Sequence, residues 1–191
     1  ALVVFVFGKL LSAEQARGRR ERQLALDAAT DALTGLPNRR AFEEYMRHLE
    51  GTAANDIMLM MLDVDHFKRI NDEFGHETGD VVLQSMAQAI QGTIRKTDFA
   101  ARIGGEEFAV VVHAFDSANA QQIAERLRSA VKVPYGPESD RRISTISVGG
   151  FWFNGHPFRY VSGIKEADEA LYRSKRAGRD RVTVTAQLQG A

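Results

Sequence analysis

The stretch "FAARIGGEEFAVVV", residues 99–112, decides the fold, because it places a pair of glycines between two short apolar runs. Apolar runs that flank a glycine pair at this spacing are typical of a β-hairpin. Around this hairpin the chain alternates in the order strand, helix, strand, strand, helix, strand. A hairpin in the middle of that order favours a mixed, mainly antiparallel sheet with helices packed on it over a parallel, doubly wound sheet. The sequence therefore predicts an α+β fold, an α/β sandwich of the ferredoxin-like type.

Hydrophobic periodicity places the other elements. Residues 57–62 are all apolar, a length and composition that indicate a central strand buried on both faces. Helices are predicted where apolar residues recur at helical spacing, around residues 42–49, 82–94, 123–131 and 167–174. We expect Asn38 to cap the first of these. Further strands are predicted near residues 143–149 and 181–184, with an irregular segment at 154–157.

Composition narrows the class of protein. The 191 residues are 44% hydrophobic, enough for one packed core. The 25 basic and 25 acidic residues give a net charge of zero, which argues against a nucleic-acid partner. The chain has no cysteine, so thiolate metal sites and cysteine nucleophiles are excluded. Any ligand that carries phosphate must therefore be held by a local group of residues.

The N-terminal region differs in character from the rest. Residues 1–7 are apolar, far fewer than the roughly 20 that span a bilayer, and a basic excess follows over residues 8–22. That pattern is typical of the cytoplasmic end of a membrane helix, and a frayed amphipathic helix is the alternative. We expect residues 1–30 to be a membrane-proximal linker helix that ends a truncated upstream region. A globular domain is expected over 31–185, with a C-terminal tail over 186–191.

Two acidic pairs follow apolar strands. Asp63 and Asp65 end the buried run, and Glu106 and Glu107 stand at the hairpin corner. In a ferredoxin-like sheet the first strand lies beside this hairpin, so the pairs are expected to meet at one edge. Carboxylates that meet repel each other unless a cation intervenes, and an all-oxygen set suits Mg²⁺ shared with phosphates. Each pair alone is equally typical of a solvated strand end or an ordinary turn.

Basic residues suited to phosphate lie near these acids in the predicted fold. Lys175 and Arg179 stand four residues apart at the end of the last predicted helix, with Gly178 between them to break it, and Lys68 follows the first acidic pair. A nucleoside triphosphate with its metal would be a partner for all three. The alternative is that basic side chains favour a helix C-terminus.

An amide and a carboxylate form a further pair. Gly75 and Gly79 are expected to bend the segment from Asn71 to Asp80 sharply and to bring these two side chains together. Such a pair can read a guanine edge, because the carboxylate accepts from ring and exocyclic N–H groups. The alternative is that both residues are helix caps.

Four ordered motifs carry a resemblance to a known family. They are "DALTGLPNRRAF" at 31–42, "DVDHFKRINDEFGHETGD" at 63–80, "GGEEF" at 104–108 and "ADEALYRSKRAGRDRV" at 167–182. Together they resemble the GGDEF diguanylate cyclase family over residues 31–185. The resemblance implies a palm-type fold, as in nucleotide cyclases, in a bacterial signalling protein. It also implies the synthesis of cyclic di-GMP from two GTP, with release of two pyrophosphates.

The resemblance also implies roles for individual residues. Two Mg²⁺ or Mn²⁺ ions per GTP site would be held by Asp63, Glu106 and the backbone carbonyl of Val64. Glu107 would assist the metals or activate the attacking hydroxyl. The substrate residues implied are Asn71 and Asp80 for guanine, Lys68, Lys175, Arg179 and the backbone N–H groups around His66 and Phe67 for phosphates, and Gly104 and Gly105 for close approach of GTP.

The family further implies a dimer and a regulatory site. One domain holds one GTP, so two domains must face each other as an antiparallel homodimer. Arg95 and Asp98 match the family's inhibitory site for the product, with Arg126 as a helper, and a surface ion pair is the alternative. The competing function is a silent module that binds GTP or cyclic di-GMP. Membrane attachment would come through the missing N-terminal region, which implies a cytoplasmic domain of an inner-membrane protein.

Overall fold

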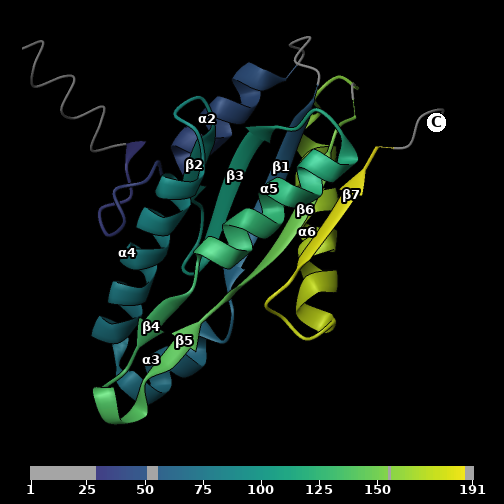
Figure 1. Ribbon diagram of the computed structural model, residues 1–191. Helices are drawn as coiled ribbons and strands as arrows, with labels where there is room; N and C mark the ends of the chain where they lie inside the picture. Colours follow the sequence, from purple (N-terminus) through teal and green to yellow (C-terminus); the bar gives the residue numbers. More distant parts are fainter. Residues whose placement is uncertain (1–28, 51–55, 155, 188–191) are drawn as a thin grey trace, which may run out of the picture.

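The computed structural model of the chain describes residues 29–50, 56–154 and 156–187 (Figure 1). Five α-helices, seven strands and one short 3₁₀ turn follow one another in this part of the chain. Their order is α2 (Arg39–Leu49), β1 (Ile57–Val64), α3 (Phe67–Phe74), α4 (His76–Thr93), β2 (Phe99–Arg102), β3 (Glu107–His113), α5 (Ser117–Ala130), β4 (Val133–Tyr135), η1 (Glu138–Asp140), β5 (Arg142–Ser144), β6 (Ile146–Trp152), α6 (Tyr160–Arg176) and β7 (Val182–Ala186).

The main sheet has the strand order β2-β3-β1-β6-β7. β1 is antiparallel to both of its neighbours, β3 and β6, and β2 is antiparallel to β3. These four strands have the ferredoxin-like order, so the predicted fold class is confirmed. β7 extends the sheet as a fifth strand parallel to β6, as expected for strands joined by a crossover helix, here α6.

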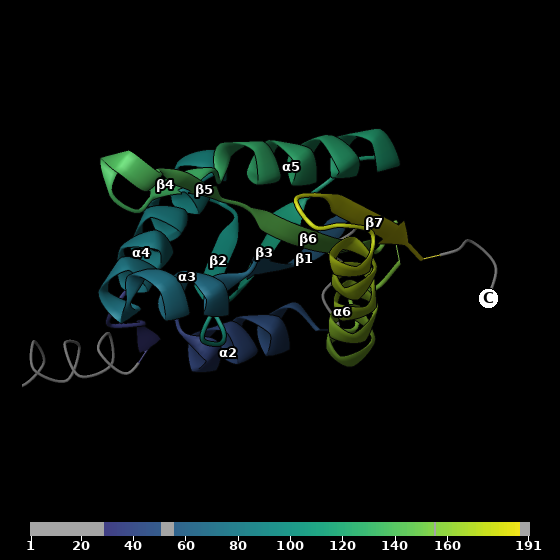
Figure 2. The ribbon, with the colours of Figure 1, turned by 90° about the horizontal axis from the view of Figure 1, so that it is seen from below.

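The central position of β1 follows from its composition. Every residue of this strand is buried, because helices cover both faces of the sheet. Met60 and Leu62 pack on one face in a cluster with residues of α4 and α5. Leu59 and Met61 pack on the other face with residues of α2 and α6. Figure 2 shows these two layers, with α5 on one side of the sheet and α2 and α6 on the other.

The strand predicted near residues 143–149 is in fact two strands in two sheets. Ser144 pairs with Val133 in a small separate sheet formed by β4 and β5, whereas Ile146 pairs with Val64 in the main sheet. Thr145 lies between the two, and its carbonyl accepts a hydrogen bond from Asp65 N at 2.9 Å. A single apolar run can thus serve two sheets when the chain crosses from one to the other, so periodicity alone did not reveal the β4–β5 hairpin.

The expected bend between Asn71 and Asp80 is made by one glycine only. Gly75 has a φ of 84° and separates α3 from α4. Gly79, the second glycine expected to bend the chain, lies buried inside α4. The prediction was therefore right for Gly75 and wrong for Gly79, whose role is different.

The ends of the predicted domain remain predictions. The linker helix expected over residues 1–30 lies outside the described residues except for its last two. The proposed membrane-proximal segment lies outside them as well. Within the described residues, none of the helices has the length and apolar character needed to cross a membrane.

Candidate active site

The two acidic pairs meet where β1 and β3 run side by side. Asp63 and Glu107 are direct partners across the two strands, and Val64 N donates to the carbonyl of Glu106 at 3.2 Å. Asp63, Gly105, Glu106 and Glu107 line one cavity of about 240 Å³. The structure therefore brings Asp63, Val64, Glu106 and Glu107 together at one edge of the sheet, as the sequence predicts.

Burial and mutual repulsion raise the pKa values of two carboxyl groups at this edge. Burial raises the pKa of Asp63, and the bond from Lys175 opposes that rise, with Nζ 2.7 Å from Asp63 Oδ2. Burial also raises the pKa of Glu106, and the charge of Asp63 raises it further. The ammonium of Lys175 is thus the positive partner of a group of carboxylates that repel one another.

The donor chemistry of the edge fits a hard divalent cation. Asp63, Glu106 and Glu107 offer carboxylate oxygens around a single cavity. Among the described residues, no three His, Cys, Asp or Glu side chains stand close enough to form a complete metal site. Mg²⁺ is commonly held by only one or two carboxylates together with substrate phosphates and water. The arrangement therefore fits a metal that is shared with a phosphate ligand.

Asp65, the other acid of the first pair, has a different environment. Its carboxylate accepts hydrogen bonds from Thr145 Oγ1 at 2.7 Å, Ser147 Oγ at 2.6 Å and Asp180 N at 2.9 Å. These three donors come from residues that lie far away in sequence. The expectation that both acids of this pair meet the hairpin is therefore wrong for Asp65, which ties the end of β1 to two other segments.

The start of α3 presents a cationic side chain and the first N–H groups of a helix. His66 precedes the helix with a φ of 58°, in the left-handed region, and its side chain makes no cap hydrogen bond. The first N–H groups of a helix lack partners within the helix, so a side-chain cap or a ligand can satisfy them. Phe67 is buried beneath this turn, and Lys68 is exposed. Lys68 forms no ion pair within the described residues.

The basic pair near the end of α6 is split between two environments. Lys175 lies in the helix and faces Asp63, whereas Arg179 follows the helix in a turn. Three successive residues of this turn have positive φ, namely 112° at Gly178, 62° at Arg179 and 40° at Asp180. The Asp180 carboxylate accepts a hydrogen bond from Arg128 Nη1 at 2.5 Å, and the Asp180 N–H donates to Asp65 Oδ2. Contacts to α5 and to the end of β1 therefore hold the turn that carries Arg179.

Asn71 and Asp80 lie on adjacent helices. Asn71 is in α3, and its Oδ1 would be 2.0 Å from a Cβ atom at Gly79 in α4. Asp80 is the next residue of α4 and is exposed. The structure thus places the amide against the turn of α4 that carries the carboxylate.

Gly104 and Gly105 form the corner between β2 and β3. A Cβ atom at Gly104 would lie 2.5 Å from Glu107 Oε2, so the Glu107 side chain lies directly over this glycine. Nothing stands within 4 Å of a Cβ atom at Gly105. Arg102 Nη2 donates to the carbonyl of Gly105 at 2.7 Å and Arg102 Nη1 to Asp31 Oδ1 at 3.0 Å. This link from the corner to the entry of the domain was not predicted.

Asp168 is a second residue that the sequence reasoning missed. It lies in α6 two turns before Lys175, and partial burial and the neighbouring charge of Glu107 raise its pKa. Asp168 and Glu107 line a cavity of about 270 Å³, with Arg39 and Glu43 of α2 also in its wall. The spacing of seven residues between Asp168 and Lys175 places both on one face of α6, and this spacing was the available signal.

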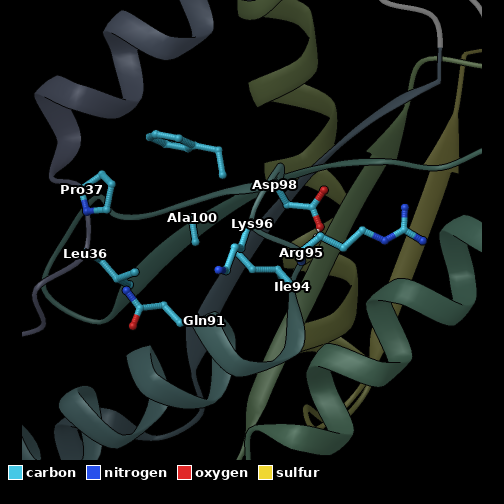
Figure 3. A pocket seen from close by; sticks show the side chains of 9 residues that line it. Leu36, Pro37, Gln91, Ile94, Arg95, Lys96, Asp98 and Ala100 are labelled. Atoms are coloured by element: carbon cyan, nitrogen blue, oxygen red, sulfur yellow. Dashed lines mark hydrogen bonds between the residues drawn. The ribbon is translucent and has the colours of Figure 1, made fainter.

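Two of the residues predicted for inhibition, Arg95 and Asp98, precede β2 in the chain, whereas the Gly104–Gly105 corner follows it. Asp98 Oδ2 accepts from Arg95 N at 2.8 Å, and both residues line a cavity of about 260 Å³. Figure 3 shows Leu36 and Pro37 across this cavity, with the Arg95 guanidinium directed away from them. Arg126 is exposed on α5 and is not part of the cavity wall. The structure therefore joins Arg95 to Asp98 and leaves Arg126 outside their pocket.

Comparison with known proteins gives this site a context. Residues 28–181 match the family described as "Diguanylate cyclase, GGDEF domain". Diguanylate cyclase DgcP of Pseudomonas aeruginosa is 44% identical over 171 residues, which cover 86% of this chain and 24% of the relative. Diguanylate cyclase DosC of Escherichia coli is 39% identical over 163 residues, which cover 82% of this chain and 35% of the relative. The chain thus spans between a quarter and about a third of the length of these two relatives.

A solved structure with a similar fold also contains a GGDEF domain. It is the crystal structure of the coiled coil and GGDEF domain of DgcB from Caulobacter crescentus in complex with c-di-GMP. Its TM-score is 0.81 at 34% sequence identity, over 96% of this chain and 99% of that one. The match to the family covers the acidic edge, the helices α3 and α4, and the turn after α6. With the acids gathered at the corner of the β2–β3 hairpin, this chain belongs to the GGDEF family of diguanylate cyclase domains.

Proposed function

We propose that this chain is the catalytic domain of a diguanylate cyclase, which converts two GTP into cyclic di-GMP and two pyrophosphates. The observation that carries the proposal is the gathering of Asp63, Glu106 and Glu107 around one cavity with Lys175 bonded to Asp63. Carboxylates whose pKa values are raised by burial and by neighbouring charges are typical of functional sites. The substrate that suits them is a nucleoside triphosphate with divalent metal.

The proposed reaction joins the two nucleotides twice. In each step the 3′-hydroxyl oxygen of one GTP attacks the α-phosphorus of the other. A new P–O bond forms, the bond from that phosphorus to pyrophosphate breaks, and the hydroxyl proton is lost. Glu107 lies over the corner glycine next to Asp63, a position suited to accept this proton or to assist the metals.

The remaining residues are assigned to binding. Lys68, Lys175 and Arg179 hold the phosphates, with the backbone N–H groups around His66 and Phe67. Asn71 and Asp80 read the guanine edge, and Gly104 and Gly105 let the nucleotide lie close to the corner. Lys175 is bonded to Asp63, which places its ammonium at the acidic edge where it would contact a phosphate.

Two Mg²⁺ or Mn²⁺ ions per GTP are the proposed cofactors, with Asp63, Glu106 and the Val64 carbonyl as ligands. Such ions, when bound, lower the pKa of the attacking hydroxyl and stabilise the leaving pyrophosphate. The fit rests on the oxygen chemistry of the acidic edge and on the raised pKa values of Asp63 and Glu106.

Turnover requires a second copy of the chain. One acidic edge accommodates one GTP, so we propose an antiparallel homodimer in which two such edges face each other. The partners are therefore GTP, a second copy and the product, with no nucleic acid. Membrane attachment through an upstream region, in the cytoplasm of a bacterium, is proposed from the basic residues over 8–22.

Product inhibition is proposed at Arg95 and Asp98, with Arg126 as a helper. The support is the cavity beside the Arg95–Asp98 pair and the cyclic di-GMP named with the DgcB structure. Titration of cyclic di-GMP into wild type and Arg95→Ala by calorimetry tests this assignment. Equal binding to both proteins would refute it.

The activity itself is tested by incubation with GTP and Mg²⁺, followed by chromatography for cyclic di-GMP. We expect product from the wild type and none from Glu106→Ala, while circular dichroism shows both folded. A fused dimeric coiled coil serves as a second form of each protein, because an enforced dimer removes a weak association as the cause of inactivity. Failure of the enforced dimer to make product while it binds GTP would favour the silent binding module.

A further inference from the structure

Gly79 stands at a helical position where the backbone does not require glycine. It lies buried in the second turn of α4, and its φ is not in the left-handed region. Glycine is a poorer helix former than alanine, so a glycine inside a helix needs another explanation. Gly92, near the end of the same helix, has nothing within 4 Å of the place of a Cβ atom. The two glycines therefore form a matched pair, one crowded and one open.

The space beside Gly79 is filled by the side chain of Asn71. A Cβ atom at Gly79 would lie 2.0 Å from Asn71 Oδ1, 3.1 Å from Asn71 Cγ and 3.2 Å from Phe67 Cζ. Real Cβ atoms do not approach other atoms to 2.0 Å, so an alanine here would displace the Asn71 amide. The buried ring of Phe67 closes the other side of the same space. Asn71 can thus keep its place only while residue 79 has no side chain.

The orientation of the Asn71 amide follows from the same contact. Its Oδ1 is buried and has no hydrogen-bond partner within the described residues, whereas the residue as a whole is only partly buried. The carbonyl end therefore faces Gly79, and the nitrogen end is the one left for a ligand. Because its Oδ1 accepts no hydrogen bond, the amide is held on this side by close packing against Gly79. A buried acceptor without a partner is rare in proteins.

We propose that Gly79 is a specificity-determining residue, which fixes the Asn71 amide with its N–H donors outward beside the carboxylate of Asp80. A donor next to an acceptor matches guanine, which presents the O6 acceptor beside the N1–H and N2–H donors. Adenine presents an amino donor where guanine has O6 and an unprotonated N1 beside it. This inference rests on the proposed function, in which the site takes GTP, and it assigns the choice of base to the clearance at Gly79.

The inference separates base selection from phosphate binding. Lys68, Lys175 and Arg179 lie outside the Gly79 contact and would hold the triphosphate of any nucleotide. Gly79→Ala is therefore expected to weaken GTP binding by about tenfold or more and to leave ATP binding unchanged. The ratio of the two affinities should fall towards one.

The experiment is calorimetric titration of the full chain with Mg²⁺ and the non-hydrolysable α,β-methylene analogues of GTP and ATP. The variants are Gly79→Ala, Asn71→Ala, the double variant and Gly92→Ala as the matched control. We expect Gly92→Ala to bind like the wild type. The double variant should bind the GTP analogue as Asn71→Ala does, because the clash needs the Asn71 side chain. In thermal unfolding, Gly79→Ala should lower the midpoint temperature less in the Asn71→Ala variant than in the wild type.

An unchanged GTP-to-ATP ratio in Gly79→Ala would overturn the inference alone. A wild type that binds neither analogue would instead overturn the proposed function, and this inference with it. Asn71→Asp serves if Gly79→Ala does not fold, since aspartate keeps the size of asparagine and replaces the outward donor with an acceptor. Loss of the preference for the GTP analogue in Asn71→Asp supports the donor-outward amide, and a retained preference refutes it.

Discussion

Asp63 and Asp65 stand two residues apart at the end of one strand, yet their surroundings are opposite. Both are almost fully buried, with 6% and 5% of their surface exposed. Asp65 accepts hydrogen bonds from three donors, two hydroxyls and one backbone N–H. Asp63 has one ammonium partner, and burial together with the charge of Glu107 raises its pKa. Two identical side chains on the same strand end thus differ because different distant segments contact them.

The difference shows how a fold separates a structural acid from a reactive one. The carboxylate of Asp65 already accepts three hydrogen bonds from the protein, so its oxygens need no ligand. A carboxylate that meets other carboxylates gains from a cation or a proton. The negative charge of Asp63 is therefore unfavourable in the fold, whereas Asp65 links three segments by hydrogen bonds. Each of the following changes tests one side of this contrast.

The largest effect is expected from Asp63→Asn. The amide keeps the size of the side chain but removes the charge that a divalent cation needs, so cyclic di-GMP synthesis should fall by roughly a thousandfold or more. Unfolding by urea should show a folded protein at least as stable as the wild type at neutral pH, because the raised pKa makes the charged Asp63 unfavourable. Activity above one tenth of the wild type would end the assignment of Asp63 as a ligand.

The reverse pattern is expected from Asp65→Asn. One of its two terminal groups becomes a donor that faces the donors of Thr145, Ser147 or Asp180, so the free energy of unfolding should fall by about 1–3 kcal/mol. Urea unfolding of Asp65→Asn measures this loss, with exposed Asp72→Asn as the matched surface control. Equal stability of the two variants would show that the three hydrogen bonds do not anchor the strand.

The carboxylate of Asp31, which accepts several hydrogen bonds, allows a test through the pH dependence of stability. Burial alone would raise the pKa of Asp31, but hydrogen bonds from Thr34 and the ion pair with Arg102 hold it below its ordinary value. A lowered folded pKa contributes stability above the unfolded pKa and loses it as pH falls through the folded pKa. Asp31→Asn should therefore cost about 1–2 kcal/mol at neutral pH, and the cost should shrink in acid. Urea unfolding across the acid range measures it, and a difference independent of pH would contradict the assignment.

The smallest effect is expected at the turn after α6. Asp180→Asn removes the charge that pairs with Arg128, while Asn still tolerates positive φ and keeps the N–H that bonds Asp65. The pair is partly exposed, so the loss should be about 0.5 kcal/mol. High salt should bring the wild type and the variant together in thermal unfolding. A loss that persists in salt would mean that the side chain holds the turn by geometry rather than charge.

The fold was predictable because its signals are local. Six apolar residues at 57–62 indicated the central strand, and the paired glycines at 104 and 105 indicated the hairpin beside it. Once the two are neighbours, the meeting of Asp63 with Glu107 follows from register. The β4–β5 hairpin escaped because its strands are only three residues long and the second continues into β6.

The parts of the site that escaped prediction depend on contacts between distant segments. The hydrogen bonds to Asp65 join residues separated by 80, 82 and 115 positions, and no local pattern announces them. Gly79 was read as a bend because glycine is more often a turn residue than a clearance for a neighbour. Asp168 had only its spacing from Lys175 as a signal. The acids and Lys175 were thus found from sequence, whereas the three donors around Asp65 were not.

The position of β1 determines the order in which parts of the domain unfold. Hydrogen-bonded strands on both sides and helices on both faces shield its amides, so their exchange with solvent deuterium should require global unfolding. α3 is a short helix that follows this strand and lies outside the main sheet. Gentle warming should therefore release α3, which carries Asn71, first, while Asp63 on β1 stays in place until the whole sheet unfolds.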